Sequence, residues 1–167
     1  MLVIDCPAGY VFYDKSGKCY KAVWNGGGIS RNDAQNECAA EGGYLASIHN
    51  AETNSFLLGL LQVRSYIGGV YENGQWTWTD GSPWDYENWR AGDPENPEVL
   101  KYAEFDYTLT GVWHNEDNTI GYDNGYICQR EVLSKFIKII FSCEGAALEV
   151  LIANVCLSLD KLKFLIM

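Results

Sequence analysis

A tryptophan-rich segment, Gln75–Trp89, constrains the fold more than any other part of the chain. It carries four tryptophans within fifteen residues. In its first part, Trp76-Thr77-Trp78, aromatic and β-branched residues alternate, which is typical of a strand. Asp80-Gly81-Ser82-Pro83 follows, and residues of these types form turns rather than extended strands. We therefore expect a short strand that leads into a compact loop, and loops of this kind are frequent sites of binding.

The composition is that of one globular domain. The chain has 167 residues, enough for one domain with a substantial core. Hydrophobic residues make up 47% and charged residues 20%, which excludes a disordered chain. The net charge is −10. This charge argues against nucleic acid and anionic membrane surfaces as partners, because both are bound by clustered Lys and Arg.

Cysteine usage indicates an oxidising compartment. The first four cysteines have the pattern of a disulfide framework, and sequence alone allows three pairings among them. None of the spacings matches a Cys/His zinc site, because there is no C-x-x-C and the only histidines are His49 and His114. We therefore expect an extracellular, secreted protein. The six cysteines are Cys6, Cys19, Cys38, Cys128, Cys143 and Cys156.

The two ends of the chain stand apart from the rest. The start does not have the pattern of a signal peptide, since Asp5 interrupts the apolar run, and we interpret residues 1–4 as the remnant of a truncated N-terminus. Residues 132–167 lack Trp, Tyr and Pro and are rich in Ile, Leu and Val. Their apolar run, Ala146–Leu159, is shorter than the roughly 20 residues of a bilayer span. Three alternatives stay open for this tail: packing on the domain, weak association with a membrane, or an artefact of gene prediction.

Local signals predict two helices and several short strands. Ser30 and Asp33 resemble a capping box at the start of the first helix, and Gly42-Gly43 ends it. Asn50 is expected to cap the second helix. A turn-rich link makes residues 6–23 a predicted hairpin. Further strands are expected at 44–48, 65–69, 102–107, 111–113 and 125–130.

These elements, in this order, resemble the long-form C-type lectin-like domain family over residues 5–131. The resemblance implies an α+β fold of two helices and two small antiparallel sheets with a long loop. It also implies disulfides Cys6–Cys19 and Cys38–Cys128. The residues that carry the resemblance are these four cysteines together with Tyr66-Ile67-Gly68-Gly69, Trp76–Pro83, Asn88-Trp89, Gly92-Asp93-Pro94, Trp113 and Tyr126-Ile127-Cys128.

Sugar-binding members of this family usually hold calcium in the long loop. Their ligands are a Glu-Pro-Asn triplet, a Glu shortly after it, and an Asn-Asp pair that follows a Trp. Calcium takes six to eight oxygen ligands. Here the triplet position reads Asp93-Pro94-Glu95, Leu100 lies near the intermediate Glu position, and His114 and Asn115 follow Trp113.

These departures predict that the usual calcium site is lost. We expect no cofactor, with calcium as the alternative if the acidic loop still gathers round a cation. The side chains that could then hold it are Asp93, Glu95, Asn115 and Asp117, within an acid-rich set that also contains Asn96, Glu98 and Glu116.

The resemblance implies a non-enzymatic recognition module that binds carbohydrate, not through the usual calcium site. The alternative is a calcium-independent protein–protein interaction module without sugar affinity. The expected partner is accordingly a glycan or a cell-surface or extracellular protein, and a membrane only if the tail is genuine. His114 has no evident nucleophile or orienting partner, which argues against catalysis. Trp84, after the Pro83 turn, is the tryptophan we expect to be exposed. The candidate ligand-binding residues are Trp84, Tyr86, Asp93, Glu95, Asn96, His114 and Asn115.

Overall fold

The computed structural model describes residues 6–24, 26–106, 110–118 and 125–132. They belong to one compact unit, Cys6–Val132. Val132, the first residue of the expected tail, packs against the hydrophobic core of this unit. The N-terminal remnant and residues 133–167, with Cys143 and Cys156, lie outside the described residues, so the expectations about them stay predictions.

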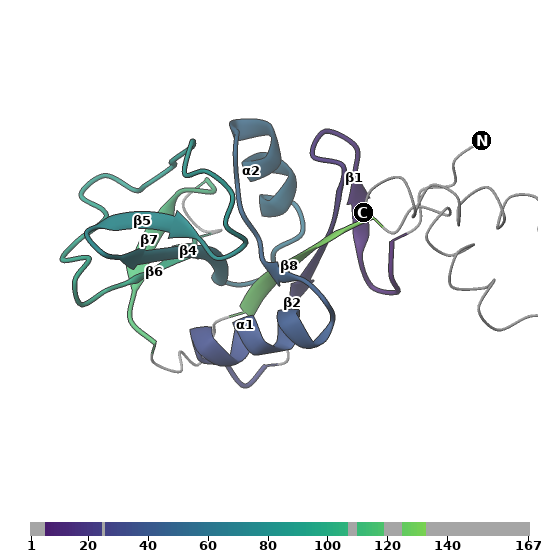
Figure 1. Cartoon of the computed structure of the whole chain (residues 1–167), viewed down its shortest axis with the longest axis horizontal. Helices are drawn as coiled ribbons and strands as arrows, with labels where there is room; N and C mark the ends of the chain where they lie inside the picture. The colour runs from purple at the N-terminus through teal and green to yellow at the C-terminus, as the bar shows by residue number, and fades with distance from the viewer. Residues whose placement is uncertain (1–5, 25, 107–109, 119–124, 133–167) are drawn as a thin grey trace, which may run out of the picture. The chain divides into compact units, whose positions relative to one another are not determined.

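The first group of strands brings the beginning and the end of the domain together. Strands β1 (Val11–Tyr13) and β2 (Lys18–Val23) form the expected antiparallel hairpin. Strand β8 (Gly125–Glu131) pairs antiparallel with β2 along its whole length. The short strand β3 (Tyr44–Leu45) pairs with the other edge of β8. The last strand of the domain therefore lies at the centre of this group (Figure 1).

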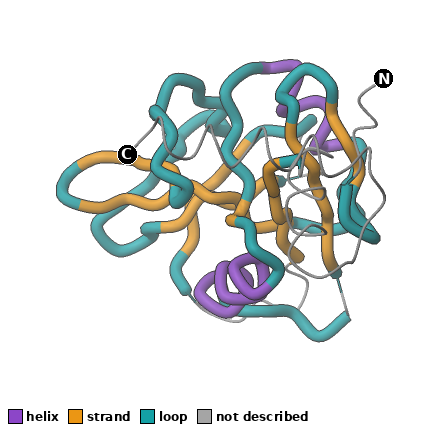
Figure 2. Tube along the Cα trace, turned by 45° about the vertical axis from the view of Figure 1, so that its right-hand side comes forward, coloured by secondary structure: helices purple, strands orange, loops and turns teal. Residues whose placement is uncertain are grey.

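Both helices begin at the predicted capping residues. Helix α1 spans Arg31–Ala40, and the Ser30 hydroxyl accepts a hydrogen bond from the Asp33 amide. Helix α2 spans Ala51–Leu58, and the Asn50 side chain accepts from the Thr53 amide at 2.8 Å. Figure 1 shows α2 above and α1 below β2 and β8, and Figure 2 likewise shows the two helices well apart, one near the top and one near the bottom, with strands between them. These caps confirm the local prediction because each depends on a side chain and an amide only three residues apart.

The second group of strands carries the tryptophan-rich segment. Strand β4 (Ser65–Glu72) pairs antiparallel with β5 (Gln75–Trp78) on one side and β6 (Tyr102–Phe105) on the other. Strand β7 (Trp113–Glu116) pairs antiparallel with β6. A short parallel pairing of β4 with β8 joins this group to the first. The α+β class is confirmed, and the two antiparallel groups form one continuous mixed sheet.

Two disulfides fasten this arrangement, in the pairing that the family resemblance implies. Cys6–Cys19 closes the N-terminal segment onto β2. Cys38–Cys128 joins α1 to β8 across 90 positions of sequence. Closing so long a loop restricts the unfolded chain and stabilises the fold by about 4–5 kcal/mol in the loop-entropy treatment.

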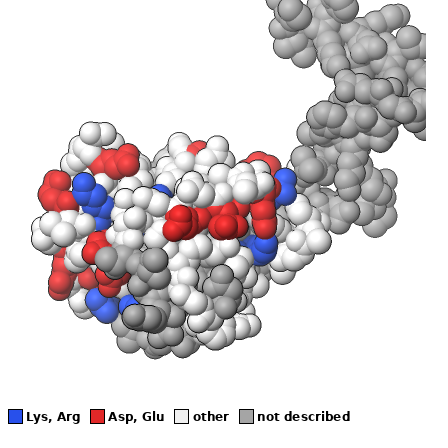
Figure 3. All heavy atoms as spheres, turned by 90° about the horizontal axis from the view of Figure 1, so that it is seen from below, with Lys and Arg blue, Asp and Glu red and all other residues white. Residues whose placement is uncertain are grey.

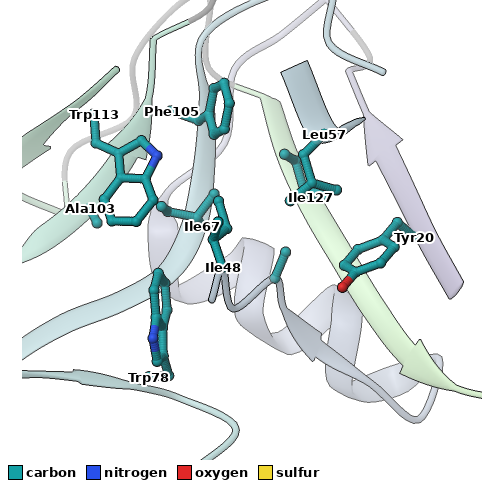
Figure 4. Close-up of a cluster of buried hydrophobic side chains, with 10 residues drawn as sticks. Tyr20, Ile48, Leu57, Ile67, Trp78, Ala103, Phe105, Trp113 and Ile127 are labelled. Carbon is teal, nitrogen blue, oxygen red and sulfur yellow. The ribbon is translucent and has the colours of Figure 1, made fainter. Parts of the chain in front are cut away.

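The larger hydrophobic cluster connects the two groups of strands. Figure 4 shows Tyr20, Leu57 and Ile127 at one end of it and Trp78 and Trp113 at the other. The tryptophans thus join the core to the base of the long loop. No helix within the described residues has the length and apolar character of a membrane span.

Candidate functional site

The long loop between β5 and β6, residues 79–101, is the candidate site, and its base is a cluster of tryptophans. The ring centroids of Trp78 and Trp84 lie 4.3 Å apart, and those of Trp76 and Trp89 lie 4.8 Å apart. Trp113 of β7 packs edge-on against three of these rings, at 5.7 to 6.1 Å. Five large rings therefore fix the loop to the sheet at its base.

Trp84 is not the exposed tryptophan that the turn predicted. Its ring is half-buried in the cluster, and its Nε1 donates to Glu87 Oε1 at 2.6 Å. Gly69 of β4 makes room for it, because a Cβ at that position would lie 3.2 Å from the Trp84 ring. The tryptophan that is exposed, at 47%, is Trp24. Its place beside Gly26-Gly27-Gly28 is a sequence signal of exposure that the analysis of motifs missed.

Tyr86 also belongs to the base of the loop. Its ring is partly buried and lies edge-on to Trp113 at a centroid distance of 5.7 Å. Burial raises the pKa of Tyr86. A tyrosine hydroxyl is already neutral at physiological pH, and it is available as a hydrogen-bond donor.

Asn115 joins strand β7 to the long loop. Its Oδ1 accepts from the Glu95 amide at 2.8 Å, and its Nδ2 donates to the carbonyls of Glu95 and Leu100, each at 2.7 Å. The side chain is buried, at 4% exposed. Each of these contacts satisfies a polar backbone group of the loop that would otherwise need water as a partner. Asn115 is therefore a brace that shapes the loop from beneath.

The remaining candidates divide into paired and exposed side chains. Asp93 Oδ2 accepts from Arg90 Nε at 2.7 Å, and its side chain is almost fully buried. Glu95 and Asn96 are exposed. We call residues 95–99, most of which are exposed, the outer part of the loop. Asn96 has a positive φ of 38°, and its carbonyl accepts from the amides of Val99 and Leu100. This turn directs the outer part of the loop towards solvent.

His114 lies away from the exposed part of the loop. It is 4% exposed on β7, and its Nε2 lies 3.4 Å from Glu104 Oε2 on β6. Glu104 was not among the sequence candidates, because no motif in the neighbouring sequence indicates a functional role for it. Its role depends on the pairing of β6 with β7, which places these two residues directly opposite each other.

Three residues at the family's calcium positions are engaged in other contacts or offer no oxygen ligand. Asp93 is paired with Arg90, Asn115 is bonded to loop backbone, and His114 offers a nitrogen where calcium prefers oxygen. Asp117 follows β7 and is half-buried. Among the described His, Cys, Asp and Glu side chains, the one group of three placed close enough to share an ion is Glu104, His114 and Glu116.

A polar network that the motifs did not reveal anchors the start of the loop. Asp80 Oδ2 accepts from Ser47 Oγ at 2.7 Å and from Gln129 Nε2. Its other oxygen accepts from the Ser82 amide at 2.9 Å. Burial by itself would raise the pKa of Asp80, but hydrogen bonds from Ser82 and Ser47 and the charge of Lys18 outweigh it and hold the pKa at about 2.

Next to this network lies a serine–histidine–aspartate arrangement. His49 Nδ1 is 2.6 Å from Asp85 Oδ1, and its Nε2 is 3.1 Å from Ser47 Oγ. Such a triad can activate a serine for nucleophilic attack. Here, however, Ser47 is 1% exposed and its hydroxyl donates to Asp80. The hydroxyl is therefore not accessible to a substrate in this structure.

Acidic residues outnumber basic ones in this chain, which has a net charge of −10. On the face drawn in Figure 3, Asp and Glu gather in several groups and the Lys and Arg side chains are fewer. The exposed acids of the long loop include Glu87, Glu95 and Glu98. A ligand of the loop therefore has to tolerate carboxylates and can use them as hydrogen-bond acceptors.

Comparison with known proteins agrees with this architecture. The family described as "Lectin C-type domain" matches residues 28–130. The galactose-specific lectin nattectin of Thalassophryne nattereri is 32% identical over 119 residues, which cover 66% of this chain and 72% of that protein.

Two solved structures extend the comparison to the fold. A calcium-independent type II antifreeze protein superposes with a TM-score of 0.70 at 25% identity, covering 80% of this chain and 98% of that one. The Ca²⁺-free form of a Ca²⁺-dependent type II antifreeze protein has a TM-score of 0.66 at 27% identity, covering 75% and 99%. These relatives differ in calcium dependence. From its fold, its disulfides and these matches, the chain belongs to the C-type lectin domain family.

Proposed function

We propose that the protein is an extracellular recognition module that binds carbohydrate through its long loop, without the family's usual calcium site. The observation that carries the proposal is that the base of the loop is fixed to the sheet while its outer part is exposed. Its base is fixed by the tryptophan cluster and by Asn115, while its outer part presents Glu95, Asn96 and Glu98 to solvent.

This outer part offers the chemistry that a sugar needs. Carboxylates accept hydrogen bonds from hydroxyl groups, and such charge-assisted bonds are among the stronger ones. The amide of Asn96 can both donate and accept. Because the base is rigid, less conformational entropy is lost when the loop binds a ligand. Direct hydrogen bonds of this kind could hold a sugar without a bridging cation.

The remaining parts of the proposal rest on the disulfides and on the relatives. Two disulfides support an extracellular location. The named relatives are a lectin and antifreeze proteins, which supports a binding rather than a catalytic role. The inaccessible hydroxyl of Ser47 points the same way.

A glycan array probed with the full chain, once in EDTA and once in calcium, tests the proposal. We expect binding in EDTA that calcium leaves unchanged. Glu95→Gln should reduce it several-fold, since a bond to a charged group, worth about 1.5–3 kcal/mol, becomes a neutral one, worth about 0.5–1.5 kcal/mol. Asn96→Gly, which allows the positive φ at this position, removes a neutral hydrogen bond and should reduce binding about 2- to 10-fold. Glu37→Gln, an exposed acid on α1, is the matched control and should bind as the wild type does. Binding that appears only in calcium would refute the calcium-independent mechanism.

A specific observation favours the alternative, a protein-interaction module. Val99 of the long loop is 59% exposed, and an apolar side chain at a loop tip suits a protein surface better than a sugar hydroxyl. An array on which no glycan binds would support this alternative. In that case Val99→Ser should weaken binding to an extracellular protein partner, while Glu37→Gln should not.

A further inference from the structure

A buried carboxylate, an imidazole and a second carboxylate converge on one face of strands β6 and β7. We propose that Glu104, His114 and Glu116 form a binding site for Zn²⁺. The site is separate from the exposed outer part of the long loop, and the proposal does not depend on carbohydrate binding.

The pairing of the strands brings the three side chains together. Glu104 and His114 are direct partners in the antiparallel register of β6 and β7, so their side chains share one face of the sheet. Glu116 follows His114 by two residues on the same strand, and alternation along a strand returns it to that face. Three potential ligands therefore occupy adjacent positions on a rigid pair of strands.

The distances suit a small divalent cation. His114 Nε2 lies 3.4 Å from Glu104 Oε2 and 3.7 Å from Glu116 Oε1. One ligand atom from each residue lies within 4.8 Å of the other two. Zinc binds nitrogen and oxygen at about 2.0–2.2 Å, so ligand atoms of a tetrahedral site are about 3.3–3.6 Å apart. A small rotation of Glu116, whose side chain is 39% exposed, would complete the approach.

The burial of Glu104 favours the binding of a cation at this position. Its side chain is fully buried, yet among the described residues neither of its oxygens accepts a hydrogen bond. Buried carboxylates are costly unless they are paired or bind a metal. Arg64 Nε lies 3.5 Å from Oε1, which leaves Oε2 facing His114. A cation between Oε2 and Nε2 would satisfy both atoms.

The set of ligands favours zinc over calcium. Calcium takes six to eight oxygens, whereas this site offers one nitrogen and two carboxylates. Imidazole is a good ligand of zinc, which needs only four ligands and commonly combines three protein groups with water. Glu116 is the half-exposed member of the group and gives the ion a route from solvent. Two carboxylates would neutralise its charge.

Bound zinc would stiffen the strand that braces the loop. Asn115, which is bonded to Glu95 and Leu100, lies between two of the proposed ligands, His114 and Glu116. Fixing both neighbours to β6 would restrict the backbone that carries the Asn115 side chain. The long loop should therefore exchange its amide hydrogens more slowly when zinc is present.

Calorimetric titration of the full chain with ZnCl₂, disulfides intact, tests the site. We expect saturable binding that a parallel titration with CaCl₂ does not reproduce. His114→Gln and Glu116→Gln should each weaken zinc binding at least about 100-fold, since losing even an outer-shell partner costs about 10- to 100-fold. Glu37→Gln, an exposed acid on α1, is the matched control and should leave the affinity unchanged.

Two further measurements keep the test decisive. Cobalt substitution distinguishes this site from metal binding by Cys143 and Cys156, because thiolate ligands give an intense near-ultraviolet band and imidazole with carboxylates does not. Melting temperatures show whether each variant folds. If His114→Gln does not fold, the half-exposed Glu116→Gln decides. Absence of zinc binding by the wild type, a thiolate spectrum, or undiminished affinity in Glu116→Gln would overturn the proposal.

Discussion

Replacing Asp80 by Asn should destabilise the domain by about 2 kcal/mol at neutral pH. The pKa of Asp80 is about 2 instead of the ordinary 3.8, and a change of one in pKa corresponds to about 1.36 kcal/mol. The side chain is 7% exposed, so solvent screens these contacts little. An amide has one acceptor oxygen and an NH₂ group, and one of Ser47 and Ser82 would lose its acceptor.

The same substitution should change the dependence of stability on pH. Because the pKa of Asp80 is lower in the folded protein, its carboxylate stabilises the fold above about pH 4. That contribution is lost as the pH falls towards 2. The difference in free energy of unfolding between wild type and Asp80→Asn should therefore be full at pH 5–7 and shrink between pH 4 and 2.

Urea unfolding followed by tryptophan fluorescence, repeated from pH 2 to pH 7, measures both quantities. Asp14→Asn, an exposed residue of the β1–β2 turn, is the matched control and should unfold as the wild type does at every pH. If Asp80→Asn were as stable as the wild type at pH 7, or differed from it by the same amount at pH 2, the network would not hold the carboxylate as described.

Three further substitutions test other parts of the structure. Trp84→Ala should lower the free energy of unfolding by about 2–3 kcal/mol, less than a fully buried tryptophan would, while the exposed Trp24→Ala should not; equal melting temperatures would place Trp84 outside the cluster. Cys38→Ser should remove about 4–5 kcal/mol and leave the domain largely unfolded by circular dichroism, and a native spectrum with an unchanged melting temperature would contradict this. Asn115→Ala should speed amide hydrogen exchange at Glu95, whose N–H loses its acceptor, without unfolding the sheet; unchanged exchange would mean that Asn115 is no brace.

Features that depend on neighbours in the sequence were predictable from it. Ser30 and Asn50 cap their helices because each side chain meets an amide three residues away. Gly43 follows the end of α1 and lies against β8. A Cβ at this position would lie 2.2 Å from the Gln129 carbonyl oxygen. The disulfide pairing was reached through the family resemblance, since composition and spacing left three pairings open.

Features that depend on partners far along the chain were not predictable. Trp84 follows a turn, which indicates exposure, but the missing side chain of Gly69 on β4 opens the space that its ring fills. Glu104 and His114 are ten positions apart in the sequence, and only the register of β6 with β7 shows that they face each other. The role of Asn115 as a brace likewise depends on the loop backbone at Leu100, which lies beside it only in the folded chain.

The Cys38–Cys128 bond determines what proteolytic cleavage of the long loop does to the domain. Because the bond joins positions 90 apart, the chain from residue 38 to residue 128 is a closed covalent ring that contains the whole loop. A single protease cut at residues 91–98 would open the ring but release no fragment. The cut protein should therefore migrate as one species on a non-reducing gel and as two after reduction. A cut in the exposed part of the loop would therefore leave the two pieces of the domain joined by the disulfide.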